Sequence, residues 1–204
     1  MDDLYSLFKE CIETEYTTVG LGADLAFRRE ANTLYIFFEC SDGVVDWMNN
    51  LSFLAVPYRD MEDVWRCHGG FLRVFKSITT VIENAISEPS VKEIIMVGYS
   101  HGAALALLCH EYVWFNYPDI RENIRGYGYG CPRVIHGSPS ADTRRRWKNF
   151  TLVQHRGDIV THLPPLLLGY THVGKKLRIG KRGLSSIDAH RPKAYLDALY
   201  NLTF

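Results

Sequence analysis

Residues 94–108 read Ile-Ile-Met-Val-Gly-Tyr-Ser-His-Gly-Ala-Ala-Leu-Ala-Leu-Leu, which is an apolar strand pattern, a Gly-x-Ser-x-Gly turn and a helix pattern of small residues. This order is typical of a nucleophile elbow, a strained turn that raises a serine hydroxyl above a parallel sheet. Glycines on both sides of the serine let the strand and the helix approach without Cβ clashes. The N–H groups at the start of the helix then face the space where an oxyanion would form. Ser100 is therefore the candidate nucleophile.

Strand and helix patterns alternate along the chain. Apolar runs predict strands at 23–28, 33–38, 93–97, 125–129 and 150–155, the first two joined as a hairpin, and helical spacing predicts helices at 3–15, 71–88 and 101–115. This alternation, with nearly continuous apolar strands, is typical of an α/β fold whose mostly parallel sheet has helices on both faces. Because no linker or internal repeat is present, we expect residues 1–204 to form a single domain.

The cysteines and the N-terminal residues bear on the location of the protein. Five widely spaced cysteines without a CxxC pair favour reduced thiols over a disulfide framework or a zinc site. The first ten residues are acidic where a signal peptide is basic, and no apolar run approaches the ~18 residues of a membrane span. We therefore expect a cytoplasmic protein that needs no metal and no cofactor.

The formal net charge of +0 conceals a division along the chain. Residues 1–120 carry 8 Lys and Arg against 18 Asp and Glu, whereas residues 121–204 carry 15 against 5. Two oppositely charged halves can attract each other in the fold, or the basic residues can form a surface that attracts anionic lipid. The basic residues concerned are Arg144, Arg145, Arg146, Lys148 and the stretch 175–182. No nucleic acid is expected as a partner, because no recognised binding module accompanies the charge.

A serine nucleophile needs a base, and the base needs an acid that fixes its tautomer. Asp158 follows the apolar run 150–155 on a tight segment, so it would lie at the carboxyl edge of the sheet beside Ser100. Two histidines beyond it can serve as the base: His190, in a turn before a C-terminal helix, and His172. The turn favours His190, because a loop there can bring the ring over Ser100, and His172 stays open as the alternative base.

Several motifs stand in the order found in one family. They are Phe38-Glu39-Cys40-Ser41 followed by Asp46-Trp47 and Asn50-Leu51, Cys67-His68-Gly69-Gly70-Phe71, Gly98–Leu105, Gly130-Cys131-Pro132-Arg133-Val134, His155–Pro165, Tyr170–Gly174, and His190 with Tyr195. In these motifs the chain resembles the class 3 lipase family of α/β-hydrolases, from about residue 20 onward.

The resemblance implies a serine carboxyl-ester hydrolase that cleaves an acylglycerol, a phospholipid or a small ester through an acyl-enzyme. It implies Ser100 as nucleophile, Asp158 as orienting acid and His190 as base, and it makes His172 structural. The expected partner is the lipid or ester substrate, with transient contact to a lipid surface.

The resemblance also implies an oxyanion hole and a lid. The backbone N–H groups of Ser41 and His101 would hold the oxyanion. Residues 44–51 would form the lid, a short amphipathic helix over the acyl pocket, with Val44, Trp47, Met48 and Leu51 as its apolar residues.

The chain departs from the family pattern in a few places. Glu39-Cys40 stands where the family has Arg-Gly, Ala103 replaces a glycine, and four residues rather than two separate His190 from Tyr195. Losing one oxyanion donor costs about 10²–10³ in rate. The altered loop therefore keeps open a silent or slow lipase-like domain that binds a lipid or protein partner. An acyltransferase with the same three residues is a further alternative, and the sequence leaves the oligomeric state open.

Overall fold

The computed structural model describes residues 3–39, 54–58, 65–181, 183 and 186–203. Within these residues the main sheet has seven strands in the order β1-β2-β3-β6-β7-β9-β11. Their bounds are β1 Thr17–Val19, β2 Ala23–Glu30, β3 Thr33–Glu39, β6 Glu93–Tyr99, β7 Ile124–Tyr129, β9 Phe150–His155 and β11 Lys175–Ile179. Strands β3, β6, β7, β9 and β11 run parallel, and the antiparallel pair β1 and β2 extends the sheet beyond β3.

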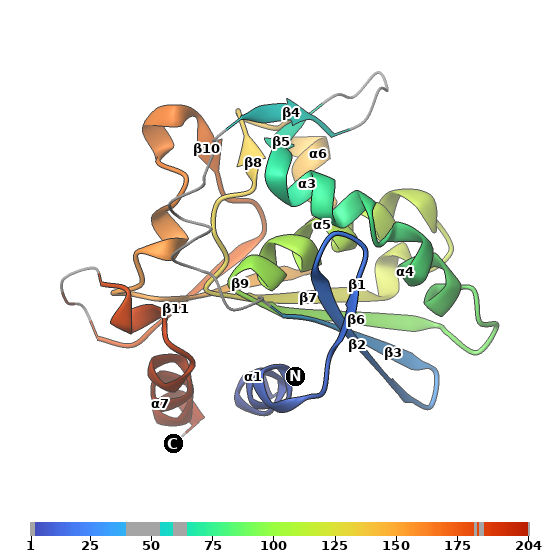
Figure 1. Ribbon diagram of the computed structural model, residues 1–204, viewed down its shortest axis with the longest axis horizontal. Helices are drawn as coiled ribbons and strands as arrows, with labels where there is room; N and C mark the ends of the chain where they lie inside the picture. Colours follow the sequence, from blue (N-terminus) through green and yellow to red (C-terminus); the bar gives the residue numbers. More distant parts are fainter. Residues whose placement is uncertain (1–2, 40–53, 59–64, 182, 184–185, 204) are drawn as a thin grey trace.

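Helices cover both faces of this sheet (Figure 1). One face carries α3 Gly69–Lys76, α4 Thr79–Ile86 and α5 His101–Asn116, and the other carries α1 Leu4–Glu13 and α7 Pro192–Thr203. Each face has its own apolar core, because successive side chains of a strand point to opposite sides. The expected α/β fold, a mostly parallel sheet between two layers of helices, is confirmed.

Helix α5 is the most deeply buried helix among those described. Nearly every side chain from Gly102 to Val113 is inaccessible to solvent. A helix that is apolar on all sides belongs in the centre of a fold rather than on its surface. The small residues of its first turns let the helix lie close to β6 and β7, which brings its N-terminal end directly against the end of β6.

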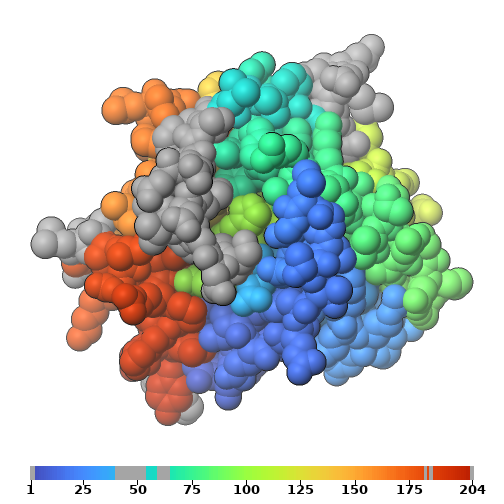
Figure 2. Space-filling model, viewed as in Figure 1, coloured from blue at the N-terminus to red at the C-terminus, as the bar shows by residue number. Residues whose placement is uncertain are grey.

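Helices α1 and α7 come from opposite ends of the chain and lie side by side (Figures 1 and 2). The rings of Tyr5 and Tyr200 meet edge to face at 6.1 Å between centroids. The Tyr129 hydroxyl donates to the backbone oxygen of Leu4 at 2.8 Å. These contacts fix the two terminal helices on the same face of the sheet.

A second, small sheet lies above the α3 side of the fold in Figure 1. In the described residues its strands run β10-β8-β5-β4. The bounds are β4 Ala55–Pro57, β5 Arg66–His68, β8 Ile135–His136 and β10 Tyr170–Thr171, and the remaining short elements are α6 Ala141–Arg145 and the 3₁₀ turns η1 Arg121–Asn123, η2 Val160–His162, η3 Leu166–Leu168 and η4 Asp188–His190. Strands of two or three residues carry too short a pattern to be recognised in a sequence.

The prediction of one helix over residues 71–88 was wrong, because two helices occupy this stretch. Ser77 N–H and its hydroxyl both donate to the carbonyl of Val74, at 3.1 and 2.7 Å. The same hydroxyl accepts from Leu21 N–H at 2.9 Å. A serine that competes for the backbone in this way favours a break over a continuous helix. The first helix also begins earlier, at Gly69, because the imidazole of His68 caps it.

The expected basic surface is only partly present. Arg146 is buried and pairs with Glu111 at 2.9 Å, so it belongs to the interior of the fold. Lys148 pairs with Glu122, and Arg145 with Asp142. The pair between Arg146 and Glu111 joins the basic and acidic halves of the chain, as does the pair between Arg125 and Glu93. Ion pairs between the two halves therefore neutralise part of the excess positive charge of residues 121–204.

The four cysteines in the described part of the chain are buried and form no disulfide: Cys11, Cys67, Cys109 and Cys131. Burial raises the pKa of Cys67 to about 12. Among the helices that the structure describes, none has the length and hydropathy needed to cross a bilayer. The single domain and the cytoplasmic location stay predictions.

His110 lies in the middle of α5, where burial lowers its pKa to about 3. In the unfolded chain its pKa returns to about 6.5. Between these two values the unfolded chain binds a proton that the folded chain does not, so stability falls as the pH falls. We predict that His110→Gln reduces this dependence by about 1.4 kcal/mol per pH unit. Urea unfolding from about pH 4 to 6.5 measures it, and identical slopes for variant and wild type would contradict the prediction.

Candidate active site

Ser100 lies between the end of β6 and the start of α5, with φ 55° and ψ −120°. A non-glycine residue in such a conformation costs on the order of 1–3 kcal/mol and is kept only where the surroundings impose it. Here the Ser100 N–H donates to the carbonyl of Tyr129, on the neighbouring strand β7, at 2.9 Å. The turn therefore has the backbone of a nucleophile elbow.

The two glycines of the elbow stand where no side chain fits. A Cβ on Gly98 would lie 2.4 Å from the carbonyl oxygen of Gly102. A Cβ on Gly102 would lie 2.1 Å from the carbonyl oxygen of Phe38, at the end of β3. Both contacts are with backbone, which cannot turn away as a side chain can. Strand β3, strand β6 and helix α5 thus meet at van der Waals distance around Ser100.

Ser100, His190 and Asp158 form one chain of hydrogen bonds. His190 Nε2 lies 2.8 Å from Ser100 Oγ, and His190 Nδ1 lies 2.8 Å from Asp158 Oδ2. A carboxylate only accepts, so Nδ1 carries the ring proton and Nε2 is left to accept from the serine hydroxyl. All three side chains are buried. This is the tautomer that a general base for Ser100 requires.

The Asp158 carboxylate receives two further hydrogen bonds. The Tyr195 hydroxyl donates to Oδ2 at 2.6 Å, and the Val160 N–H donates to Oδ1 at 2.8 Å. Burial and the neighbouring carboxylate raise the pKa of Tyr195 well above its usual value, so the phenol keeps its proton and remains a donor. A buried carboxylate needs such donors to compensate for the loss of water. Both oxygens of Asp158 are thereby fixed.

The segment that carries Asp158 is joined to the segment before His190 by strand-like pairing. Ser186 N–H donates to the carbonyl of Gly157 at 2.8 Å, and Ile159 N–H donates to the carbonyl of Ser186 at 3.4 Å. The acid and the base lie 32 positions apart, and this pairing brings them into contact. The Tyr99 hydroxyl also donates to the carbonyl of His190, and the two rings stack at 5.1 Å between centroids.

The expected oxyanion residues and lid fall partly outside the described residues. His101 is the first residue of α5, so its backbone N–H lies at the N-terminal end of the helix beside Ser100. Glu39 ends β3 next to Gly102. The expected donor Ser41 and the expected lid residues Val44, Trp47, Met48 and Leu51 lie outside the described part of the chain.

The other candidate base, His172, lies elsewhere. Its Nε2 is 2.9 Å from the carbonyl oxygen of Thr161 and 3.0 Å from the side-chain nitrogen of Gln154. Burial lowers its pKa to about 3, so the ring is neutral. The imidazole of His101 packs against Phe71, at 5.4 Å between ring centroids. Neither ring joins the chain of hydrogen bonds that ends at Ser100.

The residues that the sequence reasoning missed are Tyr99 and Tyr195. Tyr195 stands in the family motif as an aromatic residue after His190, and the motif alone indicates no role for its hydroxyl. Tyr99 is the variable residue before the serine in the elbow motif. Because the pentapeptide pattern allows any residue there, it does not indicate a role for the tyrosine side chain. A tyrosine on α7 and another at the end of β6 meet the acid and the base only through the tertiary fold.

These features together define the class of the protein. A parallel sheet with an elbow serine, a histidine at hydrogen-bond distance and a buried aspartate is the arrangement of an α/β-hydrolase. The chain belongs to the class 3 lipase family, whose model, described as Lipase (class 3), matches residues 35–168.

Curated relatives agree with this family, and a solved structure shares the fold. The chain is 29% identical over 158 residues to a lipase of Rhizomucor miehei, covering 71% of this chain and 41% of that protein. It is 27% identical over 163 residues to secreted mono- and diacylglycerol lipase 1 of Fusarium solani, covering 76% of this chain and 46% of that protein. The structure of lipase II from Rhizopus niveus matches with a TM-score of 0.71 at 24% identity, over 84% of this chain and 67% of that one. The chain thus spans less than half the length of these two curated relatives.

We predict that Gly102→Ala destabilises the fold by about 1–3 kcal/mol or more, because the added methyl group meets the backbone of β3. Helix propensity alone would predict a gain of about 1 kcal/mol at this position. The sign of the change in unfolding free energy, measured with urea, therefore separates the two. Gly183→Ala is the control, since a Cβ there meets nothing within 4 Å and should leave stability unchanged. A Gly102→Ala variant as stable as wild type would show that the elbow has room.

Proposed function

We propose that this protein is a serine carboxyl-ester hydrolase of the lipase type. The observation that carries the proposal is the hydrogen-bonded chain from Ser100 through His190 to Asp158, placed at an elbow. Nucleophile, base and orienting acid are the three roles that acyl transfer from an ester requires.

The proposed reaction begins when His190 Nε2 takes the proton of Ser100 and Oγ attacks the ester carbonyl. The tetrahedral intermediate places its oxyanion at the start of α5, where the N–H of His101 lies, and Ser41 is the proposed second donor. His190 then gives its proton to the leaving alcohol, and an acyl-enzyme remains. His190 Nε2 then takes a proton from water as the water oxygen attacks the acyl carbon. The acyl–Oγ bond breaks, His190 returns the proton to Ser100 Oγ, and the carboxylic acid is released.

Asp158 acts through His190 in this proposal. The carboxylate orients the ring and stabilises the imidazolium that forms during the attack. Tyr195 and Val160 fix the carboxylate, so they act as positioning residues. Electrostatic help of this kind is strongest at a site without water, and all three members of the chain are buried.

The substrate class follows from the relatives. One similar protein is named a lipase and another a mono- and diacylglycerol lipase. We therefore propose acylglycerols or related lipid esters as substrates. An acyltransferase would use the same residues, and analysis of products with an added alcohol acceptor separates transfer from hydrolysis.

Labelling by a fluorophosphonate probe tests the proposal directly, since such a probe reacts with an activated serine. We expect wild type to be labelled and Ser100→Ala to remain unlabelled. Ser87→Ala, at the end of α4, is the control and should be labelled as wild type is. A folded wild type that is not labelled would reject the hydrolase and leave the silent lipid- or protein-binding domain. Labelled protein would then be assayed with esters of graded acyl length.

Contact with a lipid surface is the proposed role of η3. Its three leucines are consecutive and exposed, and Leu167 has 99% of its surface accessible. No Asp, Glu, Lys or Arg occurs between residues 157 and 175 apart from Asp158, which is buried. Strand β11, which follows β10 in sequence, carries the exposed residues Lys175, Lys176 and Arg178, which suit an anionic headgroup layer. Exposed apolar side chains on η3 together with exposed cations on β11 fit an anionic bilayer better than a neutral one.

We predict that Leu167→Ser weakens binding to vesicles containing phosphatidylglycerol by about tenfold. The reason is that moving a leucine side chain out of water is favourable by about 1.5–3 kcal/mol of free energy. Sedimentation with sucrose-loaded vesicles measures the partition. Leu21→Ser removes another exposed leucine, in the turn between β1 and β2, and should leave the partition unchanged. Equal effects of the two substitutions would show that η3 has no special role.

A further inference from the structure

A polar cavity of about 210 Å³ lies at the carboxyl end of β9, where β11 forms the edge of the sheet. Its lining residues are Gln154, His155, Arg156, Thr161, His162 and Arg178. Neither Ser100 nor His190 belongs to this lining. The cavity is therefore a separate feature from the Ser100 site, although it adjoins the segment that carries Asp158.

The lining contains two guanidinium groups and no carboxylate. Within the described residues, neither Arg156 nor Arg178 makes an ion pair or a side-chain hydrogen bond. Other arginines in the described part of the chain do form ion pairs, such as Arg28 with Glu10 and Arg191 with Asp188. Two arginines beside one cavity without an acid form a site of strong positive potential.

The acids nearby in sequence are already engaged. The five Asp and Glu residues after position 120 contact the following partners: Glu122 with Lys148, Asp142 with Arg145, Asp158 with His190, Asp188 with Arg191 and Asp197 with Lys193. The cavity therefore draws no neutralising charge from this half of the chain. Beside it, burial and the nearby charges of Arg133, Arg178 and Arg144 lower the pKa of Lys176. A surplus of positive charge is concentrated at this edge of the sheet.

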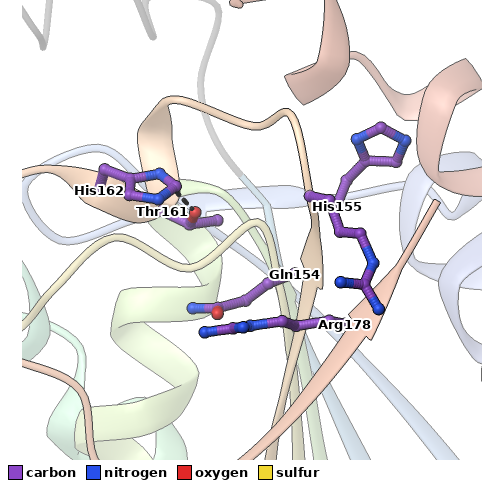
Figure 3. Close-up of a pocket in the computed structure, with 6 residues that line it drawn as sticks. Gln154, His155, Thr161, His162 and Arg178 are labelled. Carbon is purple, nitrogen blue, oxygen red and sulfur yellow. Dashed lines mark hydrogen bonds between the residues drawn. The ribbon is translucent and has the colours of Figure 1, made fainter. Parts of the chain in front are cut away.

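The arrangement of the side chains suits a small anion (Figure 3). Gln154 and Arg178 are direct neighbours in the parallel pairing of β9 and β11, so they project from the same face. Figure 3 shows them side by side, with Thr161 and His162 facing them across the cavity and the ring of His155 directed away. The cavity thus has a guanidinium floor and a polar opposite wall.

The opposite wall is rigid. Thr161 Oγ1 donates to the carbonyl oxygen of Asp158 at 3.0 Å, and His162 Nδ1 donates to the same oxygen at 2.9 Å. The ring of His162 therefore carries its proton on Nδ1. Neither of these two hydrogen bonds uses His162 Nε2. Arg133 donates to the carbonyl oxygens of His162 and Pro164 and holds the end of η2. A site that is ordered before binding loses less entropy when the ligand enters.

We propose that this cavity binds a phosphate group, with Arg156 and Arg178 as the charged donors. A phosphate carries about −1.5 to −2 charges at neutral pH and presents oxygens that match the planar fork of a guanidinium. The phosphate is either free in solution, as inorganic phosphate, or is the phosphomonoester headgroup of a lipid such as phosphatidic acid. The proposal stands independently of the ester hydrolysis proposed above.

Isothermal titration calorimetry with inorganic phosphate, at constant ionic strength, tests the site. We expect one saturable site in wild type and a loss of affinity of about tenfold or more in both Arg178→Gln and Arg156→Gln. Arg73→Gln removes the same charge from an exposed position on α3, and this variant should bind phosphate as wild type does. Binding that all four proteins share would overturn the proposal, because it would reflect net charge alone.

Vesicles of phosphatidylcholine with and without phosphatidic acid separate the two sources. Binding that depends on Arg178 only with phosphatidic acid vesicles assigns the site to the lipid headgroup, whereas binding of inorganic phosphate that depends on Arg178 assigns it to free phosphate. Absence of both overturns the proposal. Ser100→Ala should bind phosphate as wild type does, so failure of the hydrolase proposal leaves this test intact. Leu167→Ser should also keep its affinity for inorganic phosphate, which separates the cavity from the contact made by η3.

Discussion

The buried carboxylate of Asp158 is the interaction on which the site depends. Its donors come from three separate places: His190 at the end of η4, Tyr195 on α7 and the backbone of Val160 in η2. A charge removed from water is tolerated only with such compensation, and each donor is fixed by a different part of the fold. The C-terminal helix, the loop after β9 and the base are thereby held to one another.

The second constraint is steric and acts on the other side of Ser100. Gly98 and Gly102 allow the backbones of β3, β6 and α5 to meet where any Cβ would overlap. The strained dihedral angles of Ser100 persist because this contact and the hydrogen bond to Tyr129 leave the turn no alternative. The start of α5 and the end of β3 are brought together in this way, and these are the places from which the two proposed oxyanion donors come.

The charged side chains fall into two groups, those that pair inside the fold and those exposed at one edge of the sheet. Where acidic and basic halves of the chain meet inside the fold they neutralise each other, as Glu111 and Arg146 do. The remaining positive charge gathers on β11 and the end of β9, at the edge of the sheet, where no acid of the same half is available. An edge strand with exposed cations discourages pairing with other strands and also offers a place for anions. The exposed leucines of η3 lie in the connection between β9 and β11, next to β10 of the small sheet.

The sequence by itself determined what depends on neighbouring residues. The elbow occupies five consecutive positions, and the apolar strands and α5 carry their pattern within a few turns, so the α/β fold and Ser100 could be recognised locally. The break between α3 and α4 could not, because Ser77 leaves the helix through a contact with Leu21, distant in sequence. The small second sheet was missed because its strands are too short to show a period.

Only the tertiary structure brought His190 rather than His172 to Ser100, through the pairing of Ser186 with Gly157. It likewise brought Tyr99 and Tyr195 to the acid and the base, and Arg156 and Arg178 to one cavity. Contacts between residues about 20 or more positions apart are set by how whole elements pack, and no local pattern records them.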